Sequence, residues 1–314
     1  MKSIVGKRKI FFAIFLVFIL CTAVLWFTIG LNLDIEFEGG TMIQIQTENK
    51  DFTSAEAEAL VRETTGKEVK VQVLTSYNSE NPEDEIHMLQ IKVTKSEGVL
   101  SSDEQSALIQ ALIDDERFVI PENAEVQVTS VEPSIGEEVR NRGLIAVAIS
   151  AVLIILYVAI RFRAVSGFSM GVCGVIALIH DALAVVLVYM IFRLPVNESF
   201  IAAILTIIGY SINNSIIIYD RIRENMALRK KSTVAEVVDK SIKQTFSRSV
   251  LTSLTTLIAV IVVYIFARIY GITSVQQFSF PLIIGILVGT YSSICLAGPM
   301  WLQWKEMKGK KEKA

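Results

Sequence analysis

The chain has 314 residues, 52% of them hydrophobic and 20% charged, with a formal net charge of −2 at pH 7. Its charged residues are gathered in blocks between long apolar segments, which excludes a single water-soluble globular domain and indicates a membrane protein. The sequence contains none of the patterns GxxxxGK[S/T], HExxH or GxGxxG, and its GxSxG string at 167–171 opens a long apolar segment. We therefore expect no ATP-binding or hydrolytic site and no cofactor or metal.

The first apolar segment covers residues 10–30 and follows a basic stretch over 1–9. A run of about 20 apolar residues is long enough to cross the hydrocarbon core of a bilayer. It exceeds the usual core of a signal peptide, and no small-residue cleavage site follows it. We therefore predict a cytoplasmic N-terminus at 1–9 and a retained first transmembrane helix at 10–30.

Residues 31–142 then have the pattern of a folded domain outside the membrane, with 24 acidic and 9 basic residues and thus a net charge of −15. Strands are predicted at 41–46, 69–77, 85–94 and 124–131. Two helices are predicted to begin at capping boxes, Thr53 with Glu56 and Ser102 with Gln105. The order βαββαβ predicts a ferredoxin-like α+β domain. For its acidity, a solvated surface is favoured over specific binding of a basic partner.

Five further apolar segments are long enough to span a membrane, at 143–160, 167–192, 200–219, 249–267 and 278–300. Lys and Arg are frequent in the N-terminus, between the second and third spans, in the loop 220–248 and in the tail 301–314. The opposite links carry only Arg193 and Arg268. The positive-inside rule places both termini in the cytoplasm. The fold class is therefore an integral membrane protein with six transmembrane α-helices and an exoplasmic domain between the first two.

The third span contains an ionisable pair, His180 and Asp181, near its middle. Ionisable groups are costly in hydrocarbon, and those found there often belong to ion pathways. An imidazole exchanges protons near neutral pH, and an adjacent carboxylate can tune it or accept the proton. The alternative is that both side chains only bond to neighbouring helices, and the sequence leaves both interpretations open.

The fourth span carries polar or small residues that recur at steps of three and four, which predicts one polar face directed into the bundle. These residues are Thr206, Gly209, Tyr210, Asn213 and Asn214. The asparagine carbonyls can coordinate an ion, but an amide cannot carry a proton. Hydrogen bonding between helices is the favoured alternative for this face.

The fifth and sixth spans carry stripes of small side chains. Ser249, Thr252, Ser253 and Thr256 form a hydroxyl stripe with Arg248 at its cytoplasmic entrance. Arg248 can gate a hydrated path or act as an interfacial anchor, and the spacing alone slightly favours the anchor. Gly285, Gly289, Ser293 and Ala297 follow one another at steps of four, which predicts close helix packing rather than chemistry.

Four strings carry a resemblance to a known family. They are Phe37-Glu38-Gly39-Gly40-Thr41, Ala177 to Asp181, Ile201 to Asn214 with its continuation through Asp220, Arg221 and Arg223, and Ser241 to Thr256. Together they resemble the SecD/SecF family of the resistance-nodulation-division superfamily, in order along nearly the whole chain.

This resemblance implies a SecF-type, non-enzymatic subunit of the bacterial protein-export machinery. The partners it implies are SecD, the SecYEG channel, YajC as a further candidate, the exported unfolded polypeptide and membrane lipid, with no nucleic acid. It also implies a multi-pass location in the bacterial cytoplasmic membrane and a proton or sodium gradient that drives movements of the outside domain. Arg248 matches the arginine of the family's ion pathway, and this resemblance favours a functional role for Arg248 over that of an interfacial anchor.

Three positions depart from the family pattern. Asn214 stands where many relatives have aspartate, Glu36 replaces an aspartate before the GG element, and Glu132 precedes Pro133 where glycine is usual. A carboxylate needed for coupling then has to come from SecD or from Asp181. Two alternatives remain: a non-conducting scaffold for SecD, and half of a lipid or drug exporter, which one small outside domain on six spans argues against. An enzyme is the least favoured interpretation, because no nucleophile and base are matched.

Overall fold

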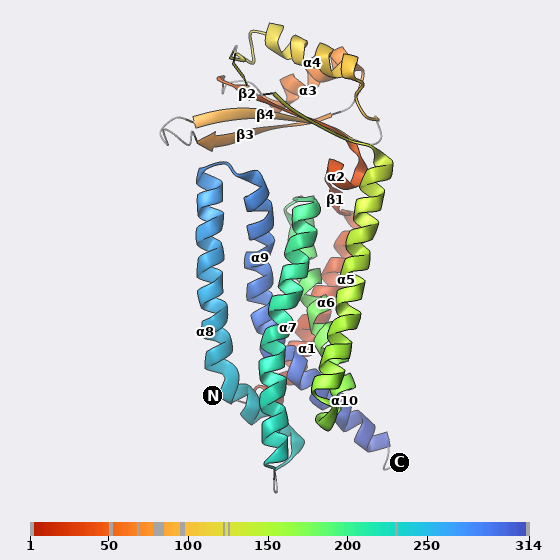
Figure 1. Ribbon diagram of the computed structural model, residues 1–314, viewed down its shortest axis with the longest axis vertical. Helices are drawn as coiled ribbons and strands as arrows, with labels where there is room; N and C mark the ends of the chain where they lie inside the picture. Colours follow the sequence, from red (N-terminus) through yellow and green to blue (C-terminus); the bar gives the residue numbers. More distant parts are fainter. Residues whose placement is uncertain are drawn as a thin grey trace.

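The computed structural model describes residues 3–49, 53–67, 69–77, 85–94, 98–121, 123–124, 126–229 and 232–311. Figure 1 shows two regions, a bundle of long helices and a smaller layer of strands and helices at one end of it. The N-terminal end of α1 and the C-terminal helix α10 both lie at the other end of the bundle.

Six helical segments in the described ranges are long and apolar enough to cross a membrane, by length and composition. The first is Val5–Thr28, in which a 3-10 turn at Val5–Lys7 leads into α1 (Arg8–Thr28). The next four are α5 (Pro133–Arg161), α6 (Gly167–Ile191), α7 (Glu198–Ala227) and α8 (Val234–Ile269), with a 3-10 turn at Arg163–Val165. The last comprises α9 (Thr273–Ser292), a π-helical segment (Ser293–Ala297) and α10 (Gly298–Lys311).

The helices divide into an inner and an outer set. Helices α6, α7 and α9 bury much of their surface within the chain, whereas α1, α5 and α8 present many large apolar side chains outward. Helices that are apolar on every side and still exposed fit a lipid environment rather than water. The inner helices are therefore where polar side chains can be shielded by other parts of the same chain.

The helices continue beyond the apolar stretches found from sequence. Helix α5 already begins at Pro133, ahead of the predicted span at 143–160. The prediction of a loop at 220–248 is wrong for most of that range, since α7 runs to Ala227 and α8 begins at Val234. A capping box of Thr233 and Glu236 starts α8. Hydropathy locates the lipid-buried part of a helix, but its polar ends are set by such local bonds.

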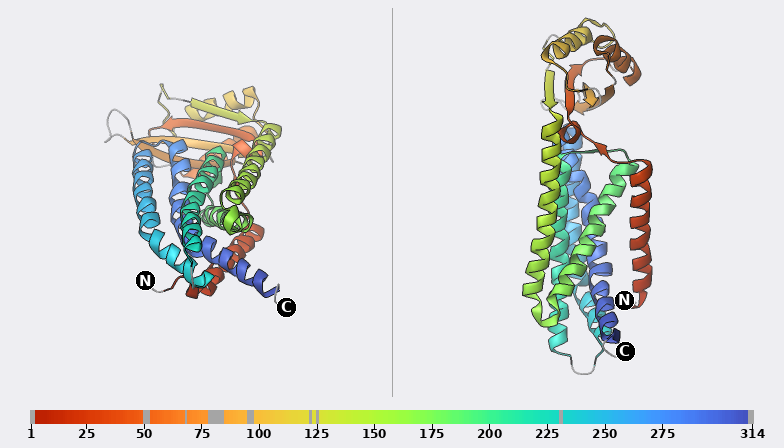
Figure 2. Two further views of the ribbon diagram at one scale, coloured as in Figure 1. Left: turned by 60° about the horizontal axis from the view of Figure 1, so that its bottom comes forward. Right: turned by 90° about the vertical axis from the view of Figure 1, so that its right-hand side faces the viewer.

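The outer region contains β2 (Gly40–Thr47), α3 (Ser54–Thr65), β3 (Val69–Tyr77), β4 (Glu85–Thr94), α4 (Ser102–Asp114) and β5 (Val126–Val131). These elements follow the predicted order, and the strands form one antiparallel sheet in the order β3-β4-β2-β5. Helices α3 and α4 cover one face of it, and the other face is turned toward the bundle (Figures 1 and 2). The core between sheet and helices includes Ile43, Ile45, Leu89, Leu108 and Leu112, all fully buried.

The helix starts in this region follow capping boxes, one of which was wrongly placed from sequence. Thr53 and Glu56 cap α3 as predicted. For α4 the pair is Ser101 with Glu104, not Ser102 with Gln105. Ser101 has the extended backbone that an N-cap needs, while Ser102 is already helical. The hydrogen bonds that Glu56 and Glu104 accept hold the pKa of each carboxyl below its usual range.

A short link joins the two regions. Strand β1 (Asn32–Leu33) pairs with β6 (Pro195–Val196), and α2 (Ile35–Glu38) follows it. Phe37 is buried against the core of the bundle.

Gly39 and Gly40 have φ of 79° and 139°, where a side chain is strained. A Cβ on Gly39 would lie 2.6 Å from the Pro133 backbone, and one on Gly40 would overlap the Val93 carbonyl. Two glycines are therefore required where the chain leaves the bundle and enters the sheet.

Candidate functional site

Three inner helices meet at the carboxylate of Asp181 on α6. Its Oδ2 accepts hydrogen bonds from Ser211 Oγ on α7 at 2.6 Å and from Ser292 Oγ on α9 at 2.8 Å. The aspartate side chain is fully buried. One carboxylate thus connects α6, α7 and α9, and a change in its charge alters contacts with both partner helices.

His180 stays beside this carboxylate, with Nδ1 at 3.2 Å from Asp181 Oδ1. Its ring is buried among Phe15 and Phe18 of α1 and Tyr291 of α9, with centroid separations of 5.3, 5.4 and 5.9 Å. Its Nε2 has no hydrogen-bond partner among the described residues. The pair predicted from sequence is therefore a contacting pair, shielded from water and able to share one proton.

The polar residues of α7 do not form the single inward face that we predicted. Asn214 is buried and its Nδ2 donates to Ser253 Oγ on α8 at 3.3 Å, whereas Asn213 is exposed. Asn213 lines a hollow of about 400 Å³ with Gly209 and with Tyr157 of α5. Adjacent residues of a helix point about 100° apart, so steps of three and four counted from different residues define two stripes.

The polar side chains of α8 are divided in the same way. Ser249 and Ser253 are buried, and Ser253 accepts from Asn214 of α7. Arg248 is exposed and has neither a hydrogen bond nor an ion pair in the part of the chain that the structure describes. Asn214 Oδ1 and Ser249 Oγ are buried without a partner among the same residues. Within the described ranges, Thr256 bonds only to the carbonyl of Thr252 in its own helix. The four hydroxyl groups and Arg248 therefore lie in different environments, and the described residues do not join them into one polar path.

The small residues of the last span contact α7 closely. A Cβ on Gly285 would overlap Ile207, and one on Gly289 would lie 3.1 Å from Ser211 Oγ and 3.5 Å from Asp181 Oδ2. Ser293 Oγ donates to the Ser211 carbonyl at 3.1 Å. Gly209 differs, because a Cβ there would meet nothing within 4 Å. Among the described residues, a side chain at this position would therefore meet no other helix.

Sequence patterns alone did not select Ser211 and Ser292, the two serines that donate to Asp181. A serine in an apolar helix commonly bonds to the preceding turn, as Ser150 does with the Ala146 carbonyl. Only the tertiary arrangement identifies which hydroxyls turn toward the carboxylate. The available signal is spacing, since Ser211 lies three residues before Asn214 and Ser292 three after Gly289.

The motif residues at the end of α7 form ion pairs that fix helix ends. Asp220 Oδ1 lies 2.7 Å from Arg223 and 3.3 Å from Arg161 at the end of α5. Arg221 pairs with Glu224 at 2.7 Å and donates to Gln244 of α8 at 2.8 Å. These contacts join α5, α7 and α8 on the side that the positive-inside rule assigns to the cytoplasm.

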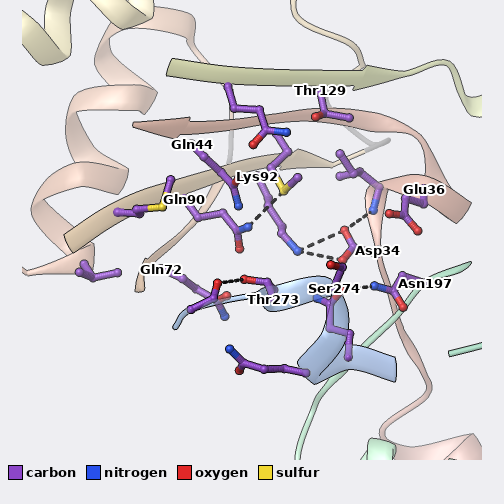
Figure 3. A pocket seen from close by; sticks show the side chains of 18 of the residues that line it. Asp34, Glu36, Gln44, Gln72, Gln90, Lys92, Thr129, Asn197, Thr273 and Ser274 are labelled. Carbon is purple, nitrogen blue, oxygen red and sulfur yellow. Dashed lines mark hydrogen bonds and ion pairs between the residues drawn. The ribbon is translucent and has the colours of Figure 1, made fainter. Parts of the chain in front are cut away.

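A second charged group lies at the opposite end of the bundle, where the link meets α7 (Figure 3). Asp34 caps α2 through the Ile35 N–H at 2.7 Å and pairs with Lys92 of β4 at 3.0 Å. Glu36 Oε2 accepts from the Glu198 N–H at 2.9 Å. Burial, and to a smaller extent nearby Asp34 and Glu198, raise the pKa of the Glu36 carboxyl. The outer region is thus bonded to the first turn of α7.

Comparison with known proteins gives a consistent result. Residues 115–307 match the family described as "Protein export membrane protein SecD/SecF, C-terminal", and residues 24–51 match "SecD/SecF GG Motif". The protein translocase subunit SecF of Thermobaculum terrenum is 35% identical over 97% of this chain and 94% of its own. The translocase subunit SecDF of Bacillus subtilis is 36% identical over 98% of this chain, which spans only 39% of that protein.

Solved structures with the same architecture are also known. The crystal structure of SecDF from Thermus thermophilus, a translocon-associated membrane protein, superposes with a TM-score of 0.80 at 32% identity. That match covers 96% of this chain and 38% of the other. A crystal structure of SecDF in a super-membrane-facing form gives a TM-score of 0.67 at 31% identity, over 99% and 40%. This chain thus spans about two fifths of the solved SecDF proteins.

Proposed function

Because this chain belongs to the SecD/SecF protein-export family, we propose that it is the SecF-type part of a translocase that uses a cation gradient to help move exported polypeptides. The relatives named protein translocase subunit SecF support the role in protein translocation. This chain spans only about two fifths of the fused SecDF relatives. Their fusion supports a SecD-type partner that corresponds to the remainder of those proteins. The SecYEG channel and YajC follow from the family resemblance.

The observation that carries the coupling proposal is the buried carboxylate of Asp181, shared by three helices. Protonation or a bound cation would change its bonds to Ser211 and Ser292 and so shift α7 and α9 relative to α6. At its outer end α7 bonds to Glu36 of the link, and α9 begins beneath the sheet. A change at Asp181 therefore has a continuous route to the outer region.

The proposed placement in the membrane follows the charge distribution. Both termini and the basic helix ends lie in the cytoplasm of a bacterial cell, and the acidic outer region is exoplasmic. The sheet order β3-β4-β2-β5 with two helices on one face supports a ferredoxin-like domain there. Arg248 and Asn213, exposed on α8 and α7, would meet the SecD-type partner within the membrane.

A non-conducting scaffold is the second candidate, and two observations favour it. Asn214 is an amide that cannot carry a proton, and Asp181 already has partners for both oxygens. A satisfied buried carboxylate also stabilises a helix interface without moving ions. The two candidates differ in whether a gradient acts through this chain.

Export into inverted membrane vesicles separates them. The vesicles contain the channel, its ATP-driven motor, the SecD-type partner and this chain, and export of a reporter is compared with and without an imposed proton or sodium gradient. We expect Asp181→Asn and Arg248→Ala to lower the gradient-dependent part about tenfold or more while the complex stays assembled, with Arg248→Lys as the matched control. Unchanged stimulation in both variants would leave this chain a scaffold.

A further inference from the structure

The uncovered face of the outer sheet carries a row of four glutamines, one from each strand. Gln44 of β2 is the register partner of both Gln90 on β4 and Gln127 on β5, and Gln90 is the partner of Gln72 on β3. Side chains alternate between the faces of a strand, so Ile43 and Ile45 enter the core while Gln44 faces away from it. The four amides therefore follow one line across the sheet.

This row forms one wall of a hollow of about 1010 Å³ between the sheet and the outer ends of α8 and α9. Arg268, Gly271, Thr273 and Ser274 contribute to the opposite wall. In Figure 3, Gln44 and Gln90 extend from the sheet toward the helix ends that carry Thr273 and Ser274. The space is bounded on two sides and has the volume of a ligand site.

The sheet amides are free to bind a ligand, in contrast to those across the hollow. The side chains of Gln44, Gln72 and Gln127 make no hydrogen bond within the described ranges, and Gln90 Nε2 reaches only the weakly accepting Met42 Sδ at 3.2 Å. Across the hollow, Gln276 donates to the Ala267 carbonyl and Gln277 accepts from Asn197. Each free amide offers two donors and one acceptor.

The chemistry of this row suits the main chain of an extended peptide. A polypeptide backbone presents one donor and one acceptor per residue at regular intervals, whatever its side chains. Four strands at about 4.8 Å spacing give a row of about 14 Å, the length of about four extended residues. Met42 and Met88 add adaptable apolar contacts. The charged residues of the lining balance, with Asp34 and Glu36 against Lys92 and Arg268, which leaves no net charge to select an ionic ligand.

We propose that this hollow binds an extended, unfolded segment of polypeptide through its main chain, with little dependence on sequence. The identification of this segment as part of an exported chain rests on the proposed function. The site lies outside the predicted spans and directly beside the link to α7, so a bound segment would contact the region that the gradient is proposed to move.

A binding measurement on the full chain with its SecD-type partner in lipid nanodiscs tests the site. The probe is a short, fluorescein-labelled, unstructured peptide of alanine, serine, threonine and leucine, followed by fluorescence anisotropy. We expect the triple variant Gln44→Ala, Gln72→Ala and Gln127→Ala to weaken binding about tenfold or more. The matched control is Gln110→Ala, whose amide bonds to Asp114 on the far helix layer and should leave binding unchanged.

The main-chain contact is tested by changing the probe. A scrambled peptide should bind within about threefold of the original, and a peptide N-methylated at alternate backbone nitrogens about tenfold more weakly. Equal binding by the triple variant, or no effect of N-methylation, would overturn the proposal. If the triple variant does not assemble, the exposed single variants Gln72→Ala and Gln127→Ala carry the test, each expected to weaken binding about threefold.

This measurement uses no gradient, motor or channel, so its failure is distinguishable from failure of the coupling proposal. Peptide binding with unchanged gradient stimulation in Asp181→Asn would keep the site and reject coupling through this chain. Loss of stimulation in that variant, with no peptide binding by the wild type, would reject the site and keep the coupling.

Discussion

One side of α7, here called the inner side, packs against α6 and α9, whereas the outer side, which carries Gly209 and Asn213, is open among the described residues. On the inner side Ser211 donates to Asp181, and Ile207 fills the space left by Gly285. On the outer side Asn213 and Gly209 border a hollow beside α5, and the Asn213 side chain has no hydrogen bond among the described residues. The same stretch of sequence therefore supplies a packed interface on one side and an open polar surface on the other.

This difference indicates where another protein is needed. A polar side chain that faces hydrocarbon loses its hydrogen bonds to water, which is costly unless another helix replaces them. Asn213 of α7 and the cation Arg248 of α8 both lack such a replacement among the described residues. We therefore expect the outer side of α7 to be completed by the SecD-type partner.

The largest expected effect comes from filling the inner contact. Gly285→Ala should lower the free energy of unfolding by about 1–3 kcal/mol, because the added methyl group overlaps Ile207. Gly209→Ala is the matched control and should change it by no more than about 1 kcal/mol in the stabilising direction, since nothing lies within 4 Å. Thermal unfolding of the purified chain in nanodiscs measures both. Equal destabilisation by the two variants would contradict the distinction between the sides.

A smaller effect is expected for the hydroxyl that holds the carboxylate. Ser211→Ala should lower the free energy of unfolding by about 1 kcal/mol, because Asp181 loses its shortest hydrogen bond. Thr206→Ala should change the free energy of unfolding by no more than about 0.5 kcal/mol, since among the described residues that exposed hydroxyl bonds only to the Ala202 carbonyl of its own helix. A double-mutant cycle with Asp181→Asn gives the coupling between the two groups. A coupling energy of zero would remove Ser211 from the network.

A substitution on the outer side of α7 should weaken assembly with the partner rather than lower the stability of the chain. Asn213→Leu should leave the unfolding of the isolated chain unchanged and weaken its association with the SecD-type partner by about threefold to thirtyfold, the worth of one interhelical polar contact. Affinity capture of the partner over a dilution series measures this. Thr206→Val serves as the control. An unaltered affinity for the leucine variant would leave Asn213 outside the partner interface.

The smallest effect concerns the link at the outer end of α7. Burial raises the pKa of the Glu36 carboxyl, so the folded state favours its protonated form. Its contribution to stability therefore falls as pH rises from the ordinary value through the raised one. Glu36→Gln should remove this dependence and raise stability at neutral pH by no more than about 0.5 kcal/mol, with no gain in mild acid. Thermal unfolding at the two pH values checks the sign.

Much of the architecture follows from periodicity, while the site needed the tertiary structure. Apolar length located the membrane helices, and alternation with capping signals gave the order of the outer elements. The error at Ser102 arose because adjacent serines each precede a Glu or Gln by three residues. Spacing selected both Asn213 and Asn214, but adjacent residues of a helix cannot share a face. The tertiary structure was needed to show that Asn214 is buried and Asn213 exposed.

The central claim is that a partner completes the outer side of α7, and contact from position 213 tests it most directly. A photo-reactive amino acid is placed at Asn213 or, as control, at exposed Leu20 of α1, which lies across the bundle from α5 (Figure 2). In membranes that hold the assembled complex, we predict crosslinks to the SecD-type partner from position 213 and none from position 20. Crosslinks to lipid alone from position 213, or equal crosslinking from both positions, would contradict the account.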